Sequence, residues 1–243
     1  MAAGVTAFLD LHCHTSASFD SLASPASVVR AAVARGLTHL AITDHDRIDG
    51  AVAARDLAMA EGDEVTILVG QEIRSRDGDL VGVFLQHAVP GGLSATETII
   101  AVHEQGGLIG IPHPYDRARG SSLIRGEDRQ MTLDAVAGSV DWIEAWNARI
   151  ILGDGNERAA ALAVEVGVPG VAVSDAHTTL EVGVAATIVT GDPSTADGLR
   201  AALSGERRLV TGHGSAYARL VTPAAKLVQR LRGNGRGQGA VPA

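Results

Sequence analysis

The chain has 243 residues, of which 46% are hydrophobic but only 3% are aromatic, and its formal net charge is −8. This length can bury one large core, which must be filled mainly by Ala, Val, Leu and Ile because aromatic side chains are scarce. The negative charge disfavours broad electrostatic binding to extended nucleic acid or to acidic membranes, since both need a positive surface.

The cysteine content and the N-terminal residues indicate in which cellular compartment the protein is expected. A single cysteine, Cys13, excludes an intramolecular disulfide framework and a cysteine-rich zinc site. The first residues lack a basic segment followed by an apolar stretch, so they do not resemble a signal peptide. No uncharged run reaches the roughly 20 residues that a membrane-spanning helix needs. The sequence therefore predicts a cytoplasmic protein without membrane contact.

Short apolar runs alternate with Ala-rich helical segments along most of the chain. The first strand is expected at 7–11 and the first helix at 25–35, where Ser24 is suited to the N-cap and Pro25 to the first helical position. The other expected strands are 39–43, 65–69, 80–85, 108–111, 140–145, 168–173 and 185–190, and the other expected helices are 49–61, 94–104, 156–166, 179–182 and 195–203.

This alternation makes about seven strand–helix units and predicts an α/β fold with parallel strands joined by crossover helices. The apolar runs are almost continuous, as in strands covered on both faces. An incomplete or distorted β/α barrel is the preferred interpretation, and an open doubly wound sheet is the alternative. Beyond residue 204 the pattern weakens, so residues 205–232 are expected to form a helical extension and residues 233–243 a disordered tail.

Histidines and carboxylates follow the expected strands at the points where those strands end. In a parallel barrel these ends meet at one rim, where active sites are assembled. Each motif alone has an ordinary interpretation as a cap, a turn or a salt-bridged carboxylate, but their repetition at five strand ends favours a shared site. The candidate ligands are His12, His14, His45, Glu72, His113, Asp175 and His177.

The mixture of imidazole and carboxylate ligands suits Zn, Mn or Fe. A carboxylate can bridge two cations, and a bridged pair lowers the pKa of a bound water and screens the charge of a phosphoryl group. Glu72 follows a buried strand and is the best candidate for such a bridge. His39, His103 and His213 lie away from the strand ends and are not expected to be ligands.

Five motifs together resemble the signatures of the PHP (polymerase and histidinol phosphatase) family. They occur in the family's order over residues 8–190 and are His12-x-His14, Thr43-Asp44-His45-Asp46, Gly70-x-Glu72, His113-Pro114 and Ser174-Asp175-Ala176-His177. The resemblance implies a distorted (β/α)7 barrel, similar to a TIM barrel, over residues 1–204, with two or three divalent metal ions.

The resemblance also implies which residues hold each ion. The first would be held by His12, His14, Glu72 and Asp175, and the second by Glu72 as a bridge together with His113. The third would be held by Asp20, His45 and His177. Many family members place a further second-metal histidine after the motif glutamate, but residues 74–86 contain none, which leaves His87 as a late substitute.

Four side chains are candidates for binding substrate beside the metals: Arg117, Arg119, Asn147 and Arg149. A guanidinium at the rim can bind two phosphate oxygens at once, although arginines in such loops also form ordinary surface salt bridges. With Glu72 and Asp175 as residues required for catalysis, the expected reaction is hydrolysis of a small phosphomonoester or nucleotide-type phosphoester by a metal-activated hydroxide.

Three other functions stay open. A lactonase or amidohydrolase would use similar ligands but usually a bridging lysine, and the sole lysine is Lys226. A nuclease acting on polynucleotide ends is disfavoured by the acidic composition. A non-catalytic regulatory domain that keeps metal is favoured only by the missing second-metal histidine.

Overall fold

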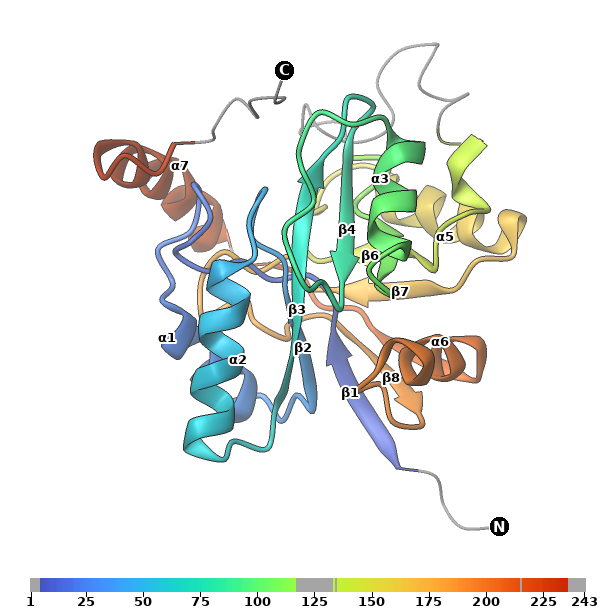
Figure 1. Cartoon of the computed structure of the whole chain (residues 1–243), viewed down its shortest axis with the longest axis horizontal. Coiled ribbons are helices and arrows are strands. Elements are labelled where there is room, and N and C mark those ends of the chain that lie inside the picture. Colours follow the sequence, from blue (N-terminus) through green and yellow to red (C-terminus); the bar gives the residue numbers. More distant parts are fainter. Residues whose placement is uncertain (1–4, 117–132, 134, 215, 236–243) are drawn as a thin grey trace.

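A mixed sheet of nine strands curls into a nearly closed barrel in the computed structural model, which describes residues 5–116, 133, 135–214 and 216–235 (Figure 1). The strand order is β7-β6-β5-β4-β3-β2-β1-β8-β9. The strands are β1 (Thr6–Asp10), β2 (His39–Ile42), β3 (Thr66–Arg74), β4 (Asp79–Val83), β5 (Leu108–Ile111), β6 (Trp142–Asn147), β7 (Gly170–Val173), β8 (Ala186–Thr190) and β9 (Arg207–Val210).

The expected barrel is confirmed, but its strands are not all parallel. Parallel pairing joins β1 to β2 to β3 and β5 to β6 to β7, whereas β4 and β8 run against their neighbours on both sides. Only residues 75–78 connect β3 to β4, which is too short for a crossover helix and therefore forms a hairpin. The expectation of uniformly parallel strands is wrong at these two positions.

The helices lie on the outside of the barrel and largely where the sequence predicts them (Figure 1). Residues 179–182, expected as a helix, form turns instead. None of the helices in the described ranges is long and apolar enough to cross a membrane. The helices are α1 (Pro25–Ala34), α2 (Asp49–Glu61), α3 (Ala95–His103), α5 (Gly155–Val166), α6 (Ala196–Ser204) and α7 (Ala216–Leu231).

The expected C-terminal helical extension, 205–232, departs from its prediction at its start. Residues Arg207–Val210 form β9 and pair with β8 in the barrel sheet, because the short apolar pair Leu209 and Val210 can extend an existing edge. The helix α7 follows at Ala216–Leu231, within the range expected to be helical. Of the expected disordered tail, Gly233 to Gly235 are described and Asn234 makes hydrogen bonds, while residues 236–243 lie outside the described part of the chain.

Three apolar layers support the sheet. The barrel interior is filled by aliphatic side chains around Trp142, including Leu9, Val81 and Leu108. Outside, α1 and α2 bury their alanine and valine faces on β2 and β3, and α3 and α5 do the same on the β3–β6 side. Burying one Val or Leu side chain contributes roughly 1.5–3 kcal/mol to the free energy of folding. A core built mainly from these residues can therefore be stable with few aromatic side chains.

At the rim that holds the strand-end motifs, the segments that follow β1 and β7 pair directly with each other. The amide of Asp175 donates to the carbonyl of His12 (2.9 Å), and the amide of His14 donates to the carbonyl of Ala176 (2.8 Å). Cys13 and Ala176 form the bridge between the segments and pack into the apolar layer outside. The alternation of strand side chains then turns the flanking histidines and Asp175 to the other face, into the barrel mouth.

Below this rim, one side chain joins β7 to β8. The Thr187 hydroxyl accepts a hydrogen bond from the amide of Ala172 (2.8 Å) and donates one to the carbonyl of Ala172 (3.0 Å). It replaces the backbone pairing that a regular neighbouring strand would supply. The closure of the barrel therefore depends on a hydroxyl at this position.

Replacing Thr187 with valine should destabilise the protein, because it keeps the side-chain shape but leaves a buried N–H and C=O without their partner. The expected loss in the free energy of unfolding is about 1–3 kcal/mol, measured by urea denaturation followed by circular dichroism. Thr190→Val, at the exposed end of the same strand, is the control and should have little effect. Equal stability of Thr187→Val and the wild type would contradict this account of closure.

Candidate metal centre

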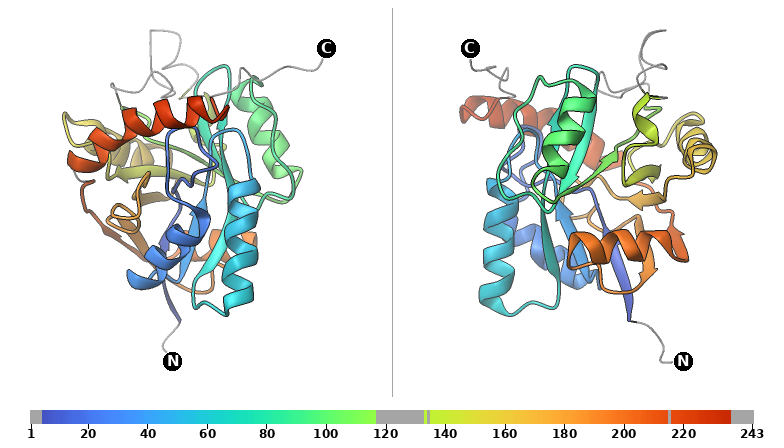
Figure 2. Two further views of the ribbon diagram at one scale, coloured as in Figure 1. Left: turned by 90° about the vertical axis from the view of Figure 1, so that its left-hand side faces the viewer. Right: turned by 45° about the vertical axis from the view of Figure 1, so that its right-hand side comes forward.

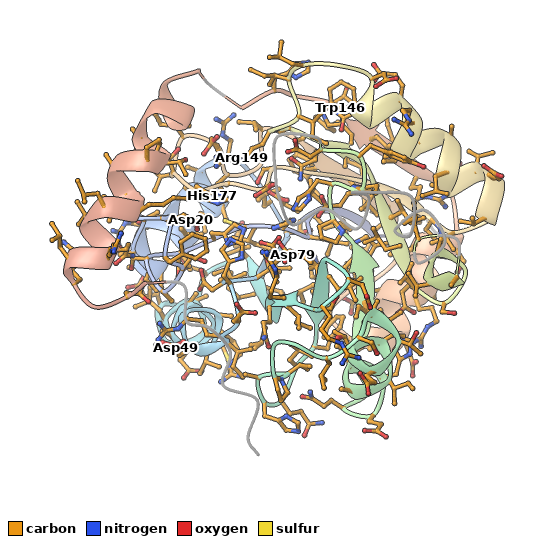
Figure 3. All side chains as sticks on the ribbon, turned by 90° about the horizontal axis from the view of Figure 1, so that it is seen from above. Asp20, Asp49, Asp79, Trp146, Arg149 and His177 are labelled. Atoms are coloured by element: carbon orange, nitrogen blue, oxygen red, sulfur yellow. The ribbon has the colours of Figure 1, made fainter. Side chains whose placement is uncertain are left out.

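Eight side chains implied as metal ligands by the sequence come together in the mouth of the barrel. They arrive from the segments after β1, β2, β5 and β7 and from β3 itself, and the side chain of His45, the most exposed of the set, is only 8% exposed. In the view onto this end of the barrel, Asp20, His177 and Arg149 lie close together (Figure 3). The set is His12, His14, Asp20, His45, Glu72, His113, Asp175 and His177.

The first group consists of His12, His14, Glu72 and Asp175. The Nε2 atoms of the two histidines are 3.0 Å apart. Glu72 Oε2 lies 3.5 and 3.4 Å from these nitrogens, and Asp175 Oδ1 lies 3.8 and 3.6 Å from them. Glu72 Oε2 is buried and also lies 3.1 Å from Nδ1 of His45, a member of the third group. His12, His14 and Asp175 thus form a cluster whose potential ligand atoms all lie within 4.8 Å of one another, and Glu72 Oε2 borders it at the two histidines. Imidazole and carboxylate donors gathered in this way suit a divalent cation.

The outer nitrogens of both histidines are already engaged. His12 Nδ1 donates to Glu144 Oε1 at 2.6 Å, and His14 Nδ1 is 3.0 Å from the Ser18 hydroxyl. A neutral ring held in this way presents a lone pair on Nε2. Two such lone pairs at 3.0 Å repel each other unless a proton or a metal ion lies between them. The residues present therefore fit a metal ion.

The second group is built on the other oxygen of Glu72. His113 Nε2 lies 3.2 Å from Glu72 Oε1, whereas Oε2 faces the first group. Glu72 therefore has the geometry of a bridge between two cations. His87 does not replace the missing histidine, because β4 runs antiparallel to β3 and carries the chain to the opposite end of the barrel before His87. On β4 the buried polar residue at the mouth is Asp79, which pairs with Arg74 at 3.5 Å.

The third group consists of His14, Asp20, His45 and His177, whose potential ligand atoms all lie within 4.8 Å of one another. Asp20 Oδ2 is 3.3 Å from His45 Nε2 and 3.3 Å from His177 Nε2. The ring of His14 stacks on His45 and lies 4.3 Å from His177 between centroids. His14 thus belongs to both the first and the third groups, so the two candidate sites are adjacent and have this residue in common.

Burial and mutual contacts set the protonation of this cluster. Burial lowers the pKa of His14 to about 4, and burial together with the Arg149 charge lowers the pKa of His177 to about 4. Both rings are therefore neutral at neutral pH, as metal ligands must be. Burial raises the pKa of Glu72, but the neighbouring His45 and His113 outweigh it and hold the pKa well below the ordinary value.

His12 differs from the other histidines. Burial lowers its pKa, but the nearby Asp175 and Glu144 carboxylates outweigh burial and hold the pKa well above the usual range. In the metal-free chain this ring therefore carries a proton, which a cation must displace.

The substrate-binding candidates have three different outcomes. Arg117 and Arg119 lie outside the described residues. Asn147 is fully buried and its amide donates to Glu144 Oε2 (2.8 Å) and Asp175 Oδ2 (3.0 Å), so it orients the Asp175 carboxylate, and its contact with substrate stays a prediction. Arg149 lies beside the third group, donates to the Thr222 hydroxyl (3.1 Å) and is 3.8 Å from Glu181.

Glu144 is the functional residue that the strand-end reasoning missed. Besides His12, it accepts hydrogen bonds from the amide of His113 (2.9 Å) and from Asn147, and it is 1% exposed. Its signal in the sequence is a carboxylate in the middle of the apolar strand Trp142–Asn147, a placement that requires partners.

Two of the ligand residues have an unusual backbone. Asp175 has φ 52° and His113 has φ 29°, in the left-handed region that side chains other than glycine rarely adopt. Such conformations cost of order 1–3 kcal/mol each and persist only where the surroundings hold them.

Comparison with known proteins agrees with this geometry. The PHP domain family matches residues 10–139, and a PHP-associated region matches residues 153–207. The chain belongs to the PHP family. An uncharacterized protein of Methanocaldococcus jannaschii is 38% identical over 152 residues, which is 57% of this chain and 81% of that protein. A 5'-3' exoribonuclease of Haemophilus influenzae is 32% identical over 130 residues, which is 49% of this chain and 46% of that enzyme.

Solved structures share the fold of this PHP protein at low sequence identity. A two-domain protein from Bacteroides vulgatus, described as containing a predicted PHP-like metal-dependent phosphoesterase, has a TM-score of 0.70 at 17% identity. The alignment covers 87% of this chain and 66% of that one, so the relative carries additional structure. The resemblance identified from the five motifs is confirmed at the level of the family.

Replacing Glu144 with glutamine should weaken metal binding in the first group, because His12 loses the anionic partner that fixes its tautomer. Loss of such a partner typically costs 10–100-fold in metal affinity, measured by titration with Mn²⁺ or Zn²⁺. Glu165→Gln, at an exposed position on α5, is the matched control. Unchanged affinity in Glu144→Gln would show that this carboxylate does not support the site.

Metal binding should release a proton, because a cation displaces the one on His12. Below the raised pKa of His12 the ring is protonated, so the apparent affinity should rise with pH by up to about tenfold per unit across the neutral range. His14 and His177, already neutral above about pH 5, add nothing to this slope. Calorimetry in buffers of different ionisation enthalpy measures the protons released, and a value of zero would refute the assignment.

Proposed function

We propose that this protein hydrolyses a small phosphomonoester or a nucleotide-type phosphoester, using two or three divalent ions of Zn, Mn or Fe. The observation that carries the proposal is the placement of Glu72, whose two oxygens face separate sets of imidazoles. Cations bridged in this way lower the pKa of a bound water and offset the charge of a phosphoryl group. Glu72 and Asp175, which would hold the ions directly, are the residues on which catalysis would depend.

Two arginine side chains near the candidate metal ligands could bind the negatively charged oxygens of a phosphate ester. Arg149 stands at the edge of the third group, and its guanidinium is held by Thr222 on α7. Arg74 is two residues beyond Glu72 on β3, so strand alternation turns it toward the same mouth, where its side chain is 41% exposed. An arginine on each side of the metal ligands can bind phosphate oxygens that the metals leave free.

The names of two similar proteins support hydrolysis of a phosphoester bond. The Haemophilus influenzae relative is named as an exoribonuclease, and the Bacteroides vulgatus structure is described as phosphoesterase-like. The net charge of −8 favours a small substrate over a long polynucleotide within this class.

A lactonase or amidohydrolase is the alternative from another class, and the position of the lysine argues against it. Lys226 lies on the exterior helix α7, with its Nζ 5.4 Å from the centre of the Phe19 ring. It is therefore not placed as a lysine between two metals would be.

A screen of phosphomonoesters, nucleotides, dinucleotides and lactones, with the protein loaded with Mn²⁺ or Zn²⁺, tests the proposal. Phosphoester turnover should fall at least about 100-fold in Glu72→Gln and Asp175→Asn, together with bound metal, because metal ions supply the main charge stabilisation. His103→Ala, at an exposed histidine on α3, should leave both unchanged. Turnover of lactones alone would overturn the proposal.

A further inference from the structure

The helix α7 places one buried amide against the loop that follows the first metal motif. Gln229 is only 2% exposed, and its Nε2 lies 2.7 Å from the carbonyl of Ser16, 3.0 Å from that of Ser18 and 2.7 Å from that of Ser21. These contacts connect positions more than 200 residues apart in the sequence. Figure 2 shows α7 lying across the loops at this end of the barrel.

The side chains of the same loop reach the metal ligands. Ser18 is hydrogen-bonded to His14 Nδ1 (3.0 Å) and accepts the amide of His45 (3.0 Å). Ser21 donates to the carbonyl of His177 (2.9 Å). Asp20 stands between these two serines and is itself a member of the third group. Every residue of the third group is thus either in the loop or hydrogen-bonded to it.

A second amide continues this attachment. Asn234, just beyond α7, directs its Nδ2 at the carbonyl of Ala17 (3.0 Å), and its side-chain oxygen accepts from Arg47 Nη1 (3.1 Å). Lys226 lies over Phe19, whose ring contacts His45 with 4.7 Å between centroids. The loop is therefore held from the side opposite to the metal ligands by three residues of the C-terminal segment.

We propose that Gln229 is a positioning residue for the third metal ion, and that α7 completes this site by holding the Ser16–Ser21 loop. Carbonyl oxygens that converge in a buried place repel each other and require a shared donor. The primary amide of Gln229 supplies two N–H groups at this point. The inference rests on the metal centre described above and adds to it that the ion of the third group depends on α7 more than the ion of the first group, in which only His14 is hydrogen-bonded to the loop.

The candidate ligands of the third group are attached to the Ser16–Ser21 loop more directly than Glu72, Asp175 and His113 are. This difference makes the inference testable. Asp20 of the third group belongs to the loop, whereas Glu72, Asp175 and His113 are held by β3, Glu144 and Asn147. Asp20 Oδ2 contacts His45 and His177, and Oδ1 is buried without a hydrogen-bond partner, so the position of the side chain depends on its own backbone and on these two histidines. Displacement of the loop should therefore move Asp20 and leave Glu72 in place.

Stepwise titration of the full chain with Mn²⁺, followed by electron paramagnetic resonance and metal analysis, tests the proposal. In Asp20→Asn one equivalent should weaken, which identifies the ion of the third group as the third equivalent of this test. In Gln229→Leu this equivalent should bind about 10–100-fold more weakly than in the wild type, with the other equivalents changed less. Arg230→Leu removes a polar side chain at the adjacent exposed position and should bind all equivalents as the wild type does. If the effect of Gln229→Leu were purely structural, the variant would be less thermally stable in EDTA, and the affinity for the third equivalent would fall no more than the affinity for the others.

The possible outcomes are distinct. Equal binding of the third equivalent by folded Gln229→Leu and wild type would overturn the role of Gln229 while leaving the metal centre intact. A wild type that binds no metal would refute the metal centre itself. If Gln229→Leu does not fold, Asn234→Leu decides, because its loop contacts are longer and nearer the surface: selective weakening of the third equivalent supports the inference, and no change refutes it.

Discussion

The convergence of electron-pair donors in a buried barrel mouth is the constraint on which the rest of the structure depends. The nitrogens of His12 and His14 lie 3.0 Å apart, and carboxylate oxygens of Glu72 and Asp175 lie within 4 Å of both nitrogens, away from water. Such a cluster is unfavourable without positive charge at its centre, because neither desolvated carboxylates nor facing imidazoles can be satisfied by one another alone.

A supporting network of polar side chains keeps these ligands in place. Glu144 joins His12 and the backbone of His113, while Asn147 joins Glu144 to Asp175. The network lies on β6, whose own residues do not enter the ligand groups. It gives the site a rigid base on a strand, whereas the third group is attached to a loop and to the C-terminal helix.

The barrel, most element positions and most candidate ligands can be predicted from the sequence because each follows from a local signal, whereas Asp20 is implied only by the family resemblance. Apolar runs mark β1 and β5, Ser94 and Glu97 form the capping box of α3, and histidines follow strand ends. The sequence does not predict that β4 and β8 are antiparallel, since apolar runs look alike in either direction. Gln229 is similarly hidden, because a glutamine within a helix ordinarily faces solvent and only tertiary contacts reveal its burial.

The left-handed backbone at His113 and Asp175 bears on how this protein could evolve. Glycine adopts that conformation at lower cost than histidine or aspartate, so each ligand is retained against its local conformational preference. Glycine at either position would relieve this backbone strain but would leave a cavity in the barrel mouth and Asn147 without its partner at Asp175. The conformations that aim these two side chains inward are therefore held by the same buried contacts that they make possible.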